Sequence, residues 1–246
     1  MEARRAETRH PGFGICGARR ATARPAEPDA PIRSQNPSKD LIASLIGLKT
    51  RQFEALINSG KGWALIELAT IKADLPDWPD KVVELWLLKL ANRGSDTGWP
   101  PPEPFGKSAW KNILGDKPLS WWKKVTWKLE DRDLNFEALS QDSRSIVNKM
   151  LDAHINNKAN VYSTMLNSKD RFESAALYVA ENGTIPEPLV GFQLKDGLSV
   201  LDGNHRMTAL CYCQATEETI LQNGGVAPVT SNSIWIGTHP SGEMPD

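Results

Sequence analysis

The region from Gly183 to Leu210 constrains the fold of this chain more than any other. Two short apolar runs, at 189–194 and 198–201, are separated by Asp196-Gly197, a dipeptide that tolerates the positive φ angle of a tight hairpin turn. Helical spacing of apolar residues resumes at Met207. The sequence therefore predicts a strand, a tight turn, a second strand, a loop and a helix, in that order.

The loop of this unit, Asp202-Gly203-Asn204-His205-Arg206, has the composition of an anion-binding site. Free N–H groups in the first turn of a helix attract anions together with the helix dipole, and a glycine lets an anion approach the backbone closely. His205 and Arg206 add side-chain donors, and Asp202 adds a carboxylate that can hold a metal ion, orient a hydroxyl or act as a base. The same residues also suit a plain turn, in which Arg206 pairs with Asp202 and ties the hairpin to the helix.

The residues around this loop resemble the ParB/sulfiredoxin superfamily. The resemblance begins in the predicted helix 169–182, and the matching residues are Gly183, Pro188, Val190, Asp196-Gly197, Val200 to Arg206 and Ala209-Leu210. A predicted strand near 121–129 is similar to an earlier strand of the same fold. The resemblance implies an α+β domain with a small mixed sheet, in which a Gly-x-x-Arg turn contacts the phosphates of a nucleotide.

Departures from the family motifs narrow this expectation. Sulfiredoxins carry a catalytic cysteine directly before the His-Arg pair, and Asn204 in that place excludes sulfinic-acid reduction through this residue. Chromosome-partitioning ParB proteins have Gly-Glu-Arg-Arg, so Asn204 and His205 argue against CTP hydrolysis of that type. The free-serine kinases of the superfamily have Asp-Gly-His-His-Arg, from which only Asn204 differs. Proteins called ParB-like nucleases share the Asp-Gly-x-His-Arg form.

Nucleotide binding is the leading functional expectation. We expect Gly203, Asn204, His205 and Arg206 to hold a nucleoside di- or triphosphate with Mg²⁺, without a metal site made by protein side chains alone. Asp202 and His205 are then candidate catalytic residues. The resemblance places Glu187 near the loop as a second candidate carboxylate, although a solvated glutamate in a proline-bracketed turn is the alternative. Whether the chain is an enzyme stays open, and phosphoryl transfer or nucleotide hydrolysis is the reaction class to test first.

Composition divides the chain into four predicted parts. Residues 1–37 are rich in arginine and lack periodic apolar residues, which predicts a disordered tail. It can be a nucleic-acid-binding arm, a targeting peptide, or upstream sequence that is not translated. Residues 38–93 have helical periodicity, 94–106 form a Pro/Gly-rich connector, and 107–240 form the predicted nucleotide-binding domain. The predicted helices and strands are Trp63–Ile71, Asp80–Ala91, the strand 121–129, helices 141–156 and 168–182, and the strand Ser233–Ile236.

A DNA-binding function is the main alternative from a different class. Residues 42–56 fit a helix-turn-helix pattern that would present Lys49, Arg51 and Gln52 to a DNA groove. The same spacing also suits apolar residues in the core of a supporting or adaptor module. The lysine pair at 123–124, among several tryptophans, can bind single strands by stacking, but such tryptophans are more often core residues. Nuclease activity would need further carboxylates near Asp202.

Charge and cysteine content restrict the remaining classes. The formal net charge of −1 argues against a chain coated with nucleic acid. The three cysteines fit neither a disulfide framework nor a zinc site, which favours a reducing, cytoplasmic setting. The longest apolar stretch, 82–91, is interrupted by charged residues and is too short to span a membrane. The oligomeric state is left open by the sequence.

Overall fold

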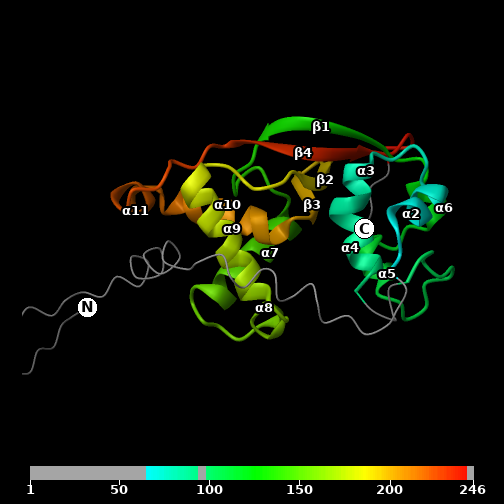
Figure 1. Cartoon of the computed structure of the whole chain (residues 1–246), viewed down its shortest axis with the longest axis horizontal. Helices are drawn as coiled ribbons and strands as arrows, with labels where there is room; N and C mark the ends of the chain where they lie inside the picture. The colour runs from blue at the N-terminus through cyan, green and yellow to red at the C-terminus, as the bar shows by residue number, and fades with distance from the viewer. Residues whose placement is uncertain (1–64, 94–97, 243–246) are drawn as a thin grey trace, which may run out of the picture. The chain divides into compact units, whose positions relative to one another are not determined.

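The computed structural model describes residues 65–93 and 98–242, which form a mixed α+β structure around a four-stranded sheet (Figure 1). This confirms the predicted α+β class. The elements before the sheet's first strand are α2 (Leu68–Asp74), α3 (Asp80–Val82), the π-helical turn η2 (Val83–Leu88), α4 (Lys89–Ala91), α5 (Trp110–Ile113) and α6 (Leu119–Trp122). They are followed by β1 (Thr126–Asp133), α7 (Gln141–His154), α8 (Val161–Thr164), α9 (Ser168–Asn182), β2 (Leu189–Leu194), β3 (Gly197–Asp202), α10 (Asn204–Ala215), α11 (Glu217–Gln222) and β4 (Ser231–Thr238).

The sheet has the strand order β1-β4-β2-β3. β1 pairs with β4 antiparallel, β4 with β2 parallel, and β2 with β3 antiparallel. The predicted hairpin is confirmed, since Gly197 turns the chain with a φ of 140° and Leu194 pairs with Gly197. The predicted final strand is also present as part of the longer β4. The strand predicted from Trp121 begins only at Thr126, because Trp121 and Trp122 belong to α6 and pack into the core.

The helices α7, α9 and α10 cover one face of the sheet. Leu198 and Val200 of β3 and Ile234 and Ile236 of β4 bury their side chains in the same cluster as these helices. α9 and α10 pack side by side, and α7 contacts both α10 and β3 (Figure 1). The predicted helices 141–156 and 168–182 are confirmed, and Gly183 ends the second one with a φ of 75°. This packing brings the start of α9 close to the start of α10.

A tryptophan-rich core covers the other face. Its largest fully buried side chains are those of Trp78, Trp86, Trp110 and Trp122, and Phe192 of β2 packs with them. Trp122 forms edge-to-face contacts with Trp78, Trp86 and Phe192 at centroid distances of 6.0, 5.1 and 5.7 Å. Residues on both sides of the Pro/Gly-rich stretch 94–106 thus contribute to one hydrophobic cluster, and all described residues belong to one compact unit.

The helical segment 80–91 follows its prediction, with a π-helical turn in the middle. Pro79 precedes the first helical residue and Asp80 begins α3. α2 begins at Leu68, later than the predicted start at residue 63, which lies outside the described residues. The predicted DNA-reading residues Lys49, Arg51 and Gln52 also lie outside the described residues, as does the whole tail 1–37. In the part of the chain that is described, no helix is long and apolar enough to cross a membrane.

Candidate functional site

The predicted phosphate loop connects β3 to α10. β3 ends at Asp202, Gly203 adopts a φ of 96°, and α10 begins at Asn204 without a side-chain cap. A helix of this length carries unpaired N–H groups in its first turn. Within α10, the Thr208 hydroxyl donates a hydrogen bond to the Asn204 carbonyl oxygen at 2.8 Å. The strand end, the glycine and the helix start therefore lie where the sequence predicts them.

Arg206 pairs with two carboxylates. Its Nη2 lies 2.7 Å from Oδ2 of Asp202, and its Nη1 lies 3.2 Å from Oε2 of Glu187. The Asp202–Arg206 pair is the contact expected of the plain-turn alternative, and it is present. Burial raises the pKa of the Asp202 carboxyl, while the positive charge of Arg206 acts in the opposite direction. Both predicted carboxylates and the predicted arginine thus converge at one point.

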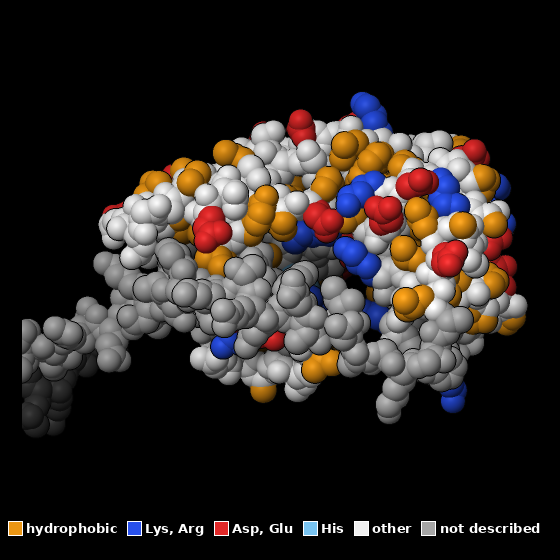
Figure 2. All heavy atoms as spheres, in the orientation of Figure 1, with side chains coloured by type: hydrophobic (Ala, Val, Ile, Leu, Met, Phe, Trp, Pro, Cys, Tyr) orange, Lys and Arg blue, Asp and Glu red, His pale blue; other side chains and the backbone are white. Residues whose placement is uncertain are grey.

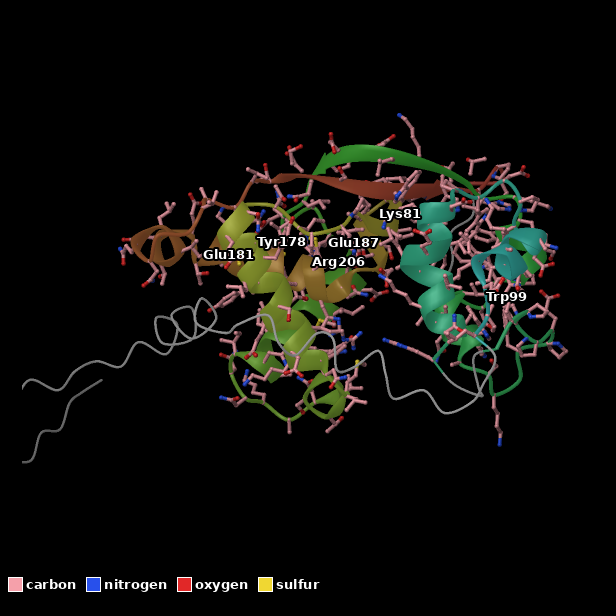
Figure 3. All side chains as sticks on the ribbon, in the orientation of Figure 1. Lys81, Trp99, Tyr178, Glu181, Glu187 and Arg206 are labelled. Carbon is pink, nitrogen blue, oxygen red and sulfur yellow. The ribbon has the colours of Figure 1, made fainter. Side chains whose placement is uncertain are left out.

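Glu187 also forms ion pairs with two lysines from the segment that precedes the sheet. Its Oε1 lies 3.2 Å from Nζ of Lys81, and its Oε2 lies 3.5 Å from Nζ of Lys89. Figure 3 labels Lys81, Glu187 and Arg206 in this region, and Figure 2 shows acidic and basic side chains gathered on the same face. Burial raises the pKa of the Glu187 carboxyl, but the hydrogen bond from Lys81 and the charges of Lys89 and Arg206 outweigh it, and the net pKa is lowered. Three cations therefore share this one carboxylate.

His205 points into a hydrogen-bonded chain with Ser168 and His154. Its Nε2 lies 2.9 Å from the Ser168 hydroxyl, which lies 3.0 Å from Nε2 of His154. Burial lowers the pKa of His205 to about 3, and the charges of Arg171, Arg93 and Arg206 contribute to this. The imidazole is therefore neutral near pH 7. His205 lies in the first turn of α10, directly after the loop glycine and Asn204. As a neutral imidazole it could offer a hydrogen bond to an anion but no positive charge.

The described residues contain no cluster of three or more His, Cys, Asp or Glu side chains arranged to hold a metal ion. Asp202 and Glu187 are the carboxylates of this site that could contact a metal ion. The additional converging carboxylates that a metal-dependent nuclease needs are not found in residues 65–93 and 98–242.

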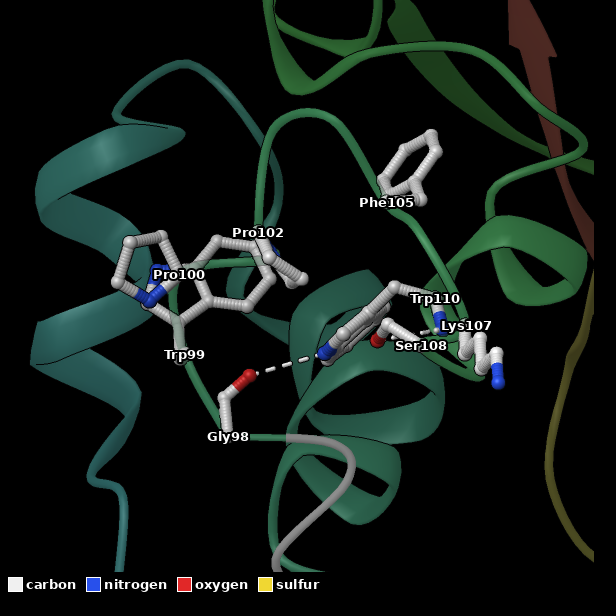
Figure 4. Close-up of a pocket in the computed structure, with 8 residues that line it drawn as sticks. All are labelled: Gly98, Trp99, Pro100, Pro102, Phe105, Lys107, Ser108 and Trp110. Atoms are coloured by element: carbon white, nitrogen blue, oxygen red, sulfur yellow. Dashed lines mark hydrogen bonds between the residues drawn. The ribbon is translucent and has the colours of Figure 1, made fainter.

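Two cavities lie outside the loop itself. One, of about 410 Å³, is lined by His154 and Ser168 together with residues of α8 and the start of α9. The other, of about 550 Å³, lies among the prolines of the connector and is drawn in Figure 4. Trp99, Phe105 and Trp110 line it, and Nε1 of Trp110 donates to the Gly98 carbonyl at 2.9 Å. None of the predicted site residues in the described part of the chain lines either cavity.

Sequence reasoning missed several residues that complete the site. Lys81 and Lys89 come from a segment more than a hundred positions before Arg206, and the sequence carries no signal of that proximity. His154 and Ser168 are the last residue of one helix and the first of another, so their meeting depends on how α7 and α9 pack. Arg171, one turn into α9, is close enough to lower the pKa of His205.

Comparison with known proteins adds no assignment, since no family model, no curated protein and no solved structure matches this chain. Functional conclusions therefore rest on the residues themselves.

Proposed function

We propose that this chain is a nucleotide-binding protein of the ParB/sulfiredoxin-like type, which holds phosphate groups at the loop Asp202–Arg206. One observation carries the proposal: Lys81, Lys89 and Arg206 all lie within 3.5 Å of the single carboxylate of Glu187. These three cations come from two distant parts of the chain. The motif Asp-Gly-x-His-Arg, with its resemblance to that superfamily, supplies the second line of support.

The charge balance favours an anionic ligand. Lys81, Lys89 and Arg206 carry three positive charges. The carboxylates paired with them, Asp202, Glu187 and Glu84, carry three negative charges. Arg171 and Arg93 add positive charge near His205. Like charges gathered in a partly buried region repel one another, and an added phosphate would relieve that repulsion. The unpaired N–H groups at the start of α10 provide donors for phosphate oxygens in the same place.

Residues of the loop and the charged residues around it have distinct parts in this proposal. Gly203 lets the guanidinium of Arg206 lie close to the loop backbone. Arg206 in turn provides a forked donor for phosphate oxygens. The side chains of Lys81 and Lys89 are exposed, and in this proposal they neutralise the outer phosphates of the nucleotide. Asp202 and Glu187 are the carboxylates available to bind Mg²⁺ through water or to activate a hydroxyl in phosphoryl transfer or hydrolysis.

A thermal-shift panel tests the proposal. Nucleoside di- and triphosphates and inorganic triphosphate, each with and without Mg²⁺, would be added to the wild type and to the Arg206→Ala, Lys89→Ala and Arg132→Ala variants. Arg132 pairs with Glu130 on β1, away from the loop, and serves as the arginine control. We expect at least one nucleotide to raise the melting temperature of the wild type and of Arg132→Ala by several degrees. The shift should be lost in Arg206→Ala and reduced in Lys89→Ala.

Two results would reject the proposal. One is the absence of any nucleotide-dependent shift in the wild type. The other is an equal shift in the wild type, Arg206→Ala and Lys89→Ala. The Lys89 side chain is exposed, so Lys89→Ala should fold normally. Arg206→Ala leaves the Asp202 carboxylate without its ion-pair partner and is therefore expected to be less stable. The inorganic triphosphate arm separates phosphate recognition from recognition of a base.

A further inference from the structure

The hydroxyl of Ser168 lies between two imidazoles. Oγ is 3.0 Å from Nε2 of His154 and 2.9 Å from Nε2 of His205, and Ser168 is 1% exposed. A hydroxyl has one proton, so it can donate to only one of these nitrogens and must accept from the other. One imidazole is therefore a hydrogen-bond acceptor toward Oγ. This is the arrangement of a serine paired with a general base.

Two residues of this hydrogen-bonded chain also line a cavity. Ser168 and His154 line the cavity of about 410 Å³, whereas His205 does not line it and belongs to the phosphate loop. Of the two imidazoles, His154 is therefore the one next to a molecule in the cavity. If His154 accepts the Oγ proton, His205 must donate to Oγ. Burial lowers the pKa of His154, with a smaller effect from the charge of Lys169, so its imidazole is neutral near pH 7 and can accept a proton.

The backbone around Ser168 suits a nucleophile. Ser168 is the first residue of α9, a helix of 15 residues, and follows Asn167, which adopts a φ of 55°. α9 has no side-chain cap. The Ser168 N–H donates to the Met165 carbonyl and the Arg171 N–H to the Asn167 carbonyl, which leaves the N–H groups of Lys169 and Asp170 for a ligand. Backbone N–H groups in this position stabilise the negative charge that develops on a carbonyl oxygen under attack. Lys169 and Asp170, which supply the next N–H groups, also line the cavity.

We propose that Ser168 is a nucleophile, with His154 as its general base, that attacks the carbonyl carbon of a small ester bound in this cavity. A bond forms between Oγ and the carbonyl carbon while the Oγ proton passes to Nε2 of His154. The bond from that carbon to the leaving oxygen then breaks, and His154 returns the proton to the leaving alcohol. A water molecule hydrolyses the acyl-serine in the same manner, with His154 taking the proton of the water and giving it back to Oγ.

The cavity restricts the ester to a small acyl group with polar substituents. Its volume is within the range of small-molecule sites. Asn157, Asn167 and Lys169 contribute polar groups to its lining, while Ala153, Ala159 and Met165 contribute apolar surface. A long-chain acyl group finds no extended apolar channel among these residues. The proposal does not rest on nucleotide binding, because none of the loop residues 202–206 lines the cavity.

A fluorophosphonate probe tests the nucleophile directly. Its phosphorus forms a bond to an activated serine Oγ and loses fluoride, so the product is identified by peptide mass spectrometry. We expect the wild type to be labelled at Ser168, and Ser168→Ala to be unlabelled. His154→Gln should be labelled at least about a hundredfold more slowly, which is the contribution typical of a general base. Ser174→Ala, which removes an exposed serine from the same helix, is the matched control and should be labelled at the wild-type rate.

Hydrolysis of p-nitrophenyl acetate provides the second readout, and it should follow the same order among the variants. Ser168→Cys guards against a folding defect in Ser168→Ala, since the cysteine should be alkylated rapidly by iodoacetamide in the native protein while His154 is present. The proposal is overturned if the wild type is not labelled, if the label lies on another serine, or if His154→Gln is labelled as fast as the wild type. Slow alkylation of Ser168→Cys, equal to that of a free thiol in solution or slower, also overturns it.

Discussion

The guanidinium of Arg206 folds back over Gly203. A Cβ built on Gly203 would stand 2.9 Å from Nη2 and 3.1 Å from Nε of Arg206, and 2.5 Å from a methyl group of Leu189. Gly203 also has a φ of 96°, a conformation that side chains rarely adopt. The position therefore requires glycine for two reasons. Its φ is positive, and a Cβ would collide with the Arg206 side chain that pairs with Asp202 and Glu187.

Substitution of this glycine should show both effects. We expect Gly203→Ala to lower the free energy of unfolding by at least about 2 kcal/mol, from backbone strain and from the displaced Leu189 and Arg206. Gly224→Ala is the control, because Gly224 has a φ of 83° and nothing within 4 Å of an added Cβ. It should lose only about 1 kcal/mol from backbone strain. Urea unfolding of the two variants measures the difference, and equal losses would show that the close approach is unimportant.

Glu187 should compete with a phosphate for the surrounding cations. Glu187→Gln removes one negative charge from the group formed by Lys81, Lys89 and Arg206, and keeps the size of the side chain. If the loop binds phosphate as proposed, this variant should bind inorganic triphosphate without Mg²⁺ roughly tenfold more tightly, or about 1.4 kcal/mol. Isothermal titration calorimetry measures it. Glu181→Gln, an exposed position on the neighbouring α9, is the control for the change in net charge and should bind like the wild type.

Weaker or unchanged binding by Glu187→Gln would mean that the cations serve to hold the carboxylate and not to receive a ligand.

His205 should make stability depend on pH between about 6.5 and 3. Burial and neighbouring arginines lower its pKa to about 3 from the usual 6.5, so the unfolded chain binds a proton in this range and the folded chain does not. The stabilising contribution is therefore complete above pH 6.5 and is lost as the pH falls. Burial lowers the pKa of His154 in the same direction.

We expect the free energy of unfolding of the wild type to fall from pH 7 to pH 5, and to fall less steeply in His205→Gln. Urea unfolding at half-unit steps of pH measures the two slopes. The range stops at pH 5 so that most carboxylates stay ionised in both states. Parallel curves for the two proteins would contradict a buried, neutral His205.

Local patterns were sufficient to predict the hairpin, the loop and the helix that follows it. Asp196-Gly197 marks the turn, the apolar residues alternate between two cores, and Gly203 marks the boundary between strand and helix. These features depend on neighbours in sequence, which is why β2, β3 and α10 lie where the sequence placed them. The convergence of Glu187 with Asp202 and Arg206 also depends on one short segment.

The remaining parts of the site depend on contacts that a single sequence does not contain. Lys81 reaches Glu187 because the tryptophan-rich core holds its helix against the sheet, and Ser168 meets His205 because α9 packs on α10. The sequence predicts the start of β1 too early, at Trp121, because Val125 and Trp127 alternate with polar residues in this stretch. In the structure Trp121 lies in the helical turn α6 and its side chain is buried in the core.

The tryptophan core should make the segment 65–93 unfold together with the sheet. Trp86 is 2% exposed and forms edge-to-face contacts with Trp122 and Trp127, which bring it into the same cluster as Phe192 of β2. We expect Trp86→Ala to lower the free energy of unfolding by about 3–5 kcal/mol, as is typical of large cavities in a core. Trp99→Ala, at a half-buried position in the connector, should cost less. In both variants the urea transitions measured by tryptophan fluorescence and by far-UV circular dichroism should coincide, because one core links both segments. Separate transitions for the two signals would show instead that the helices before residue 94 form an independent folding unit.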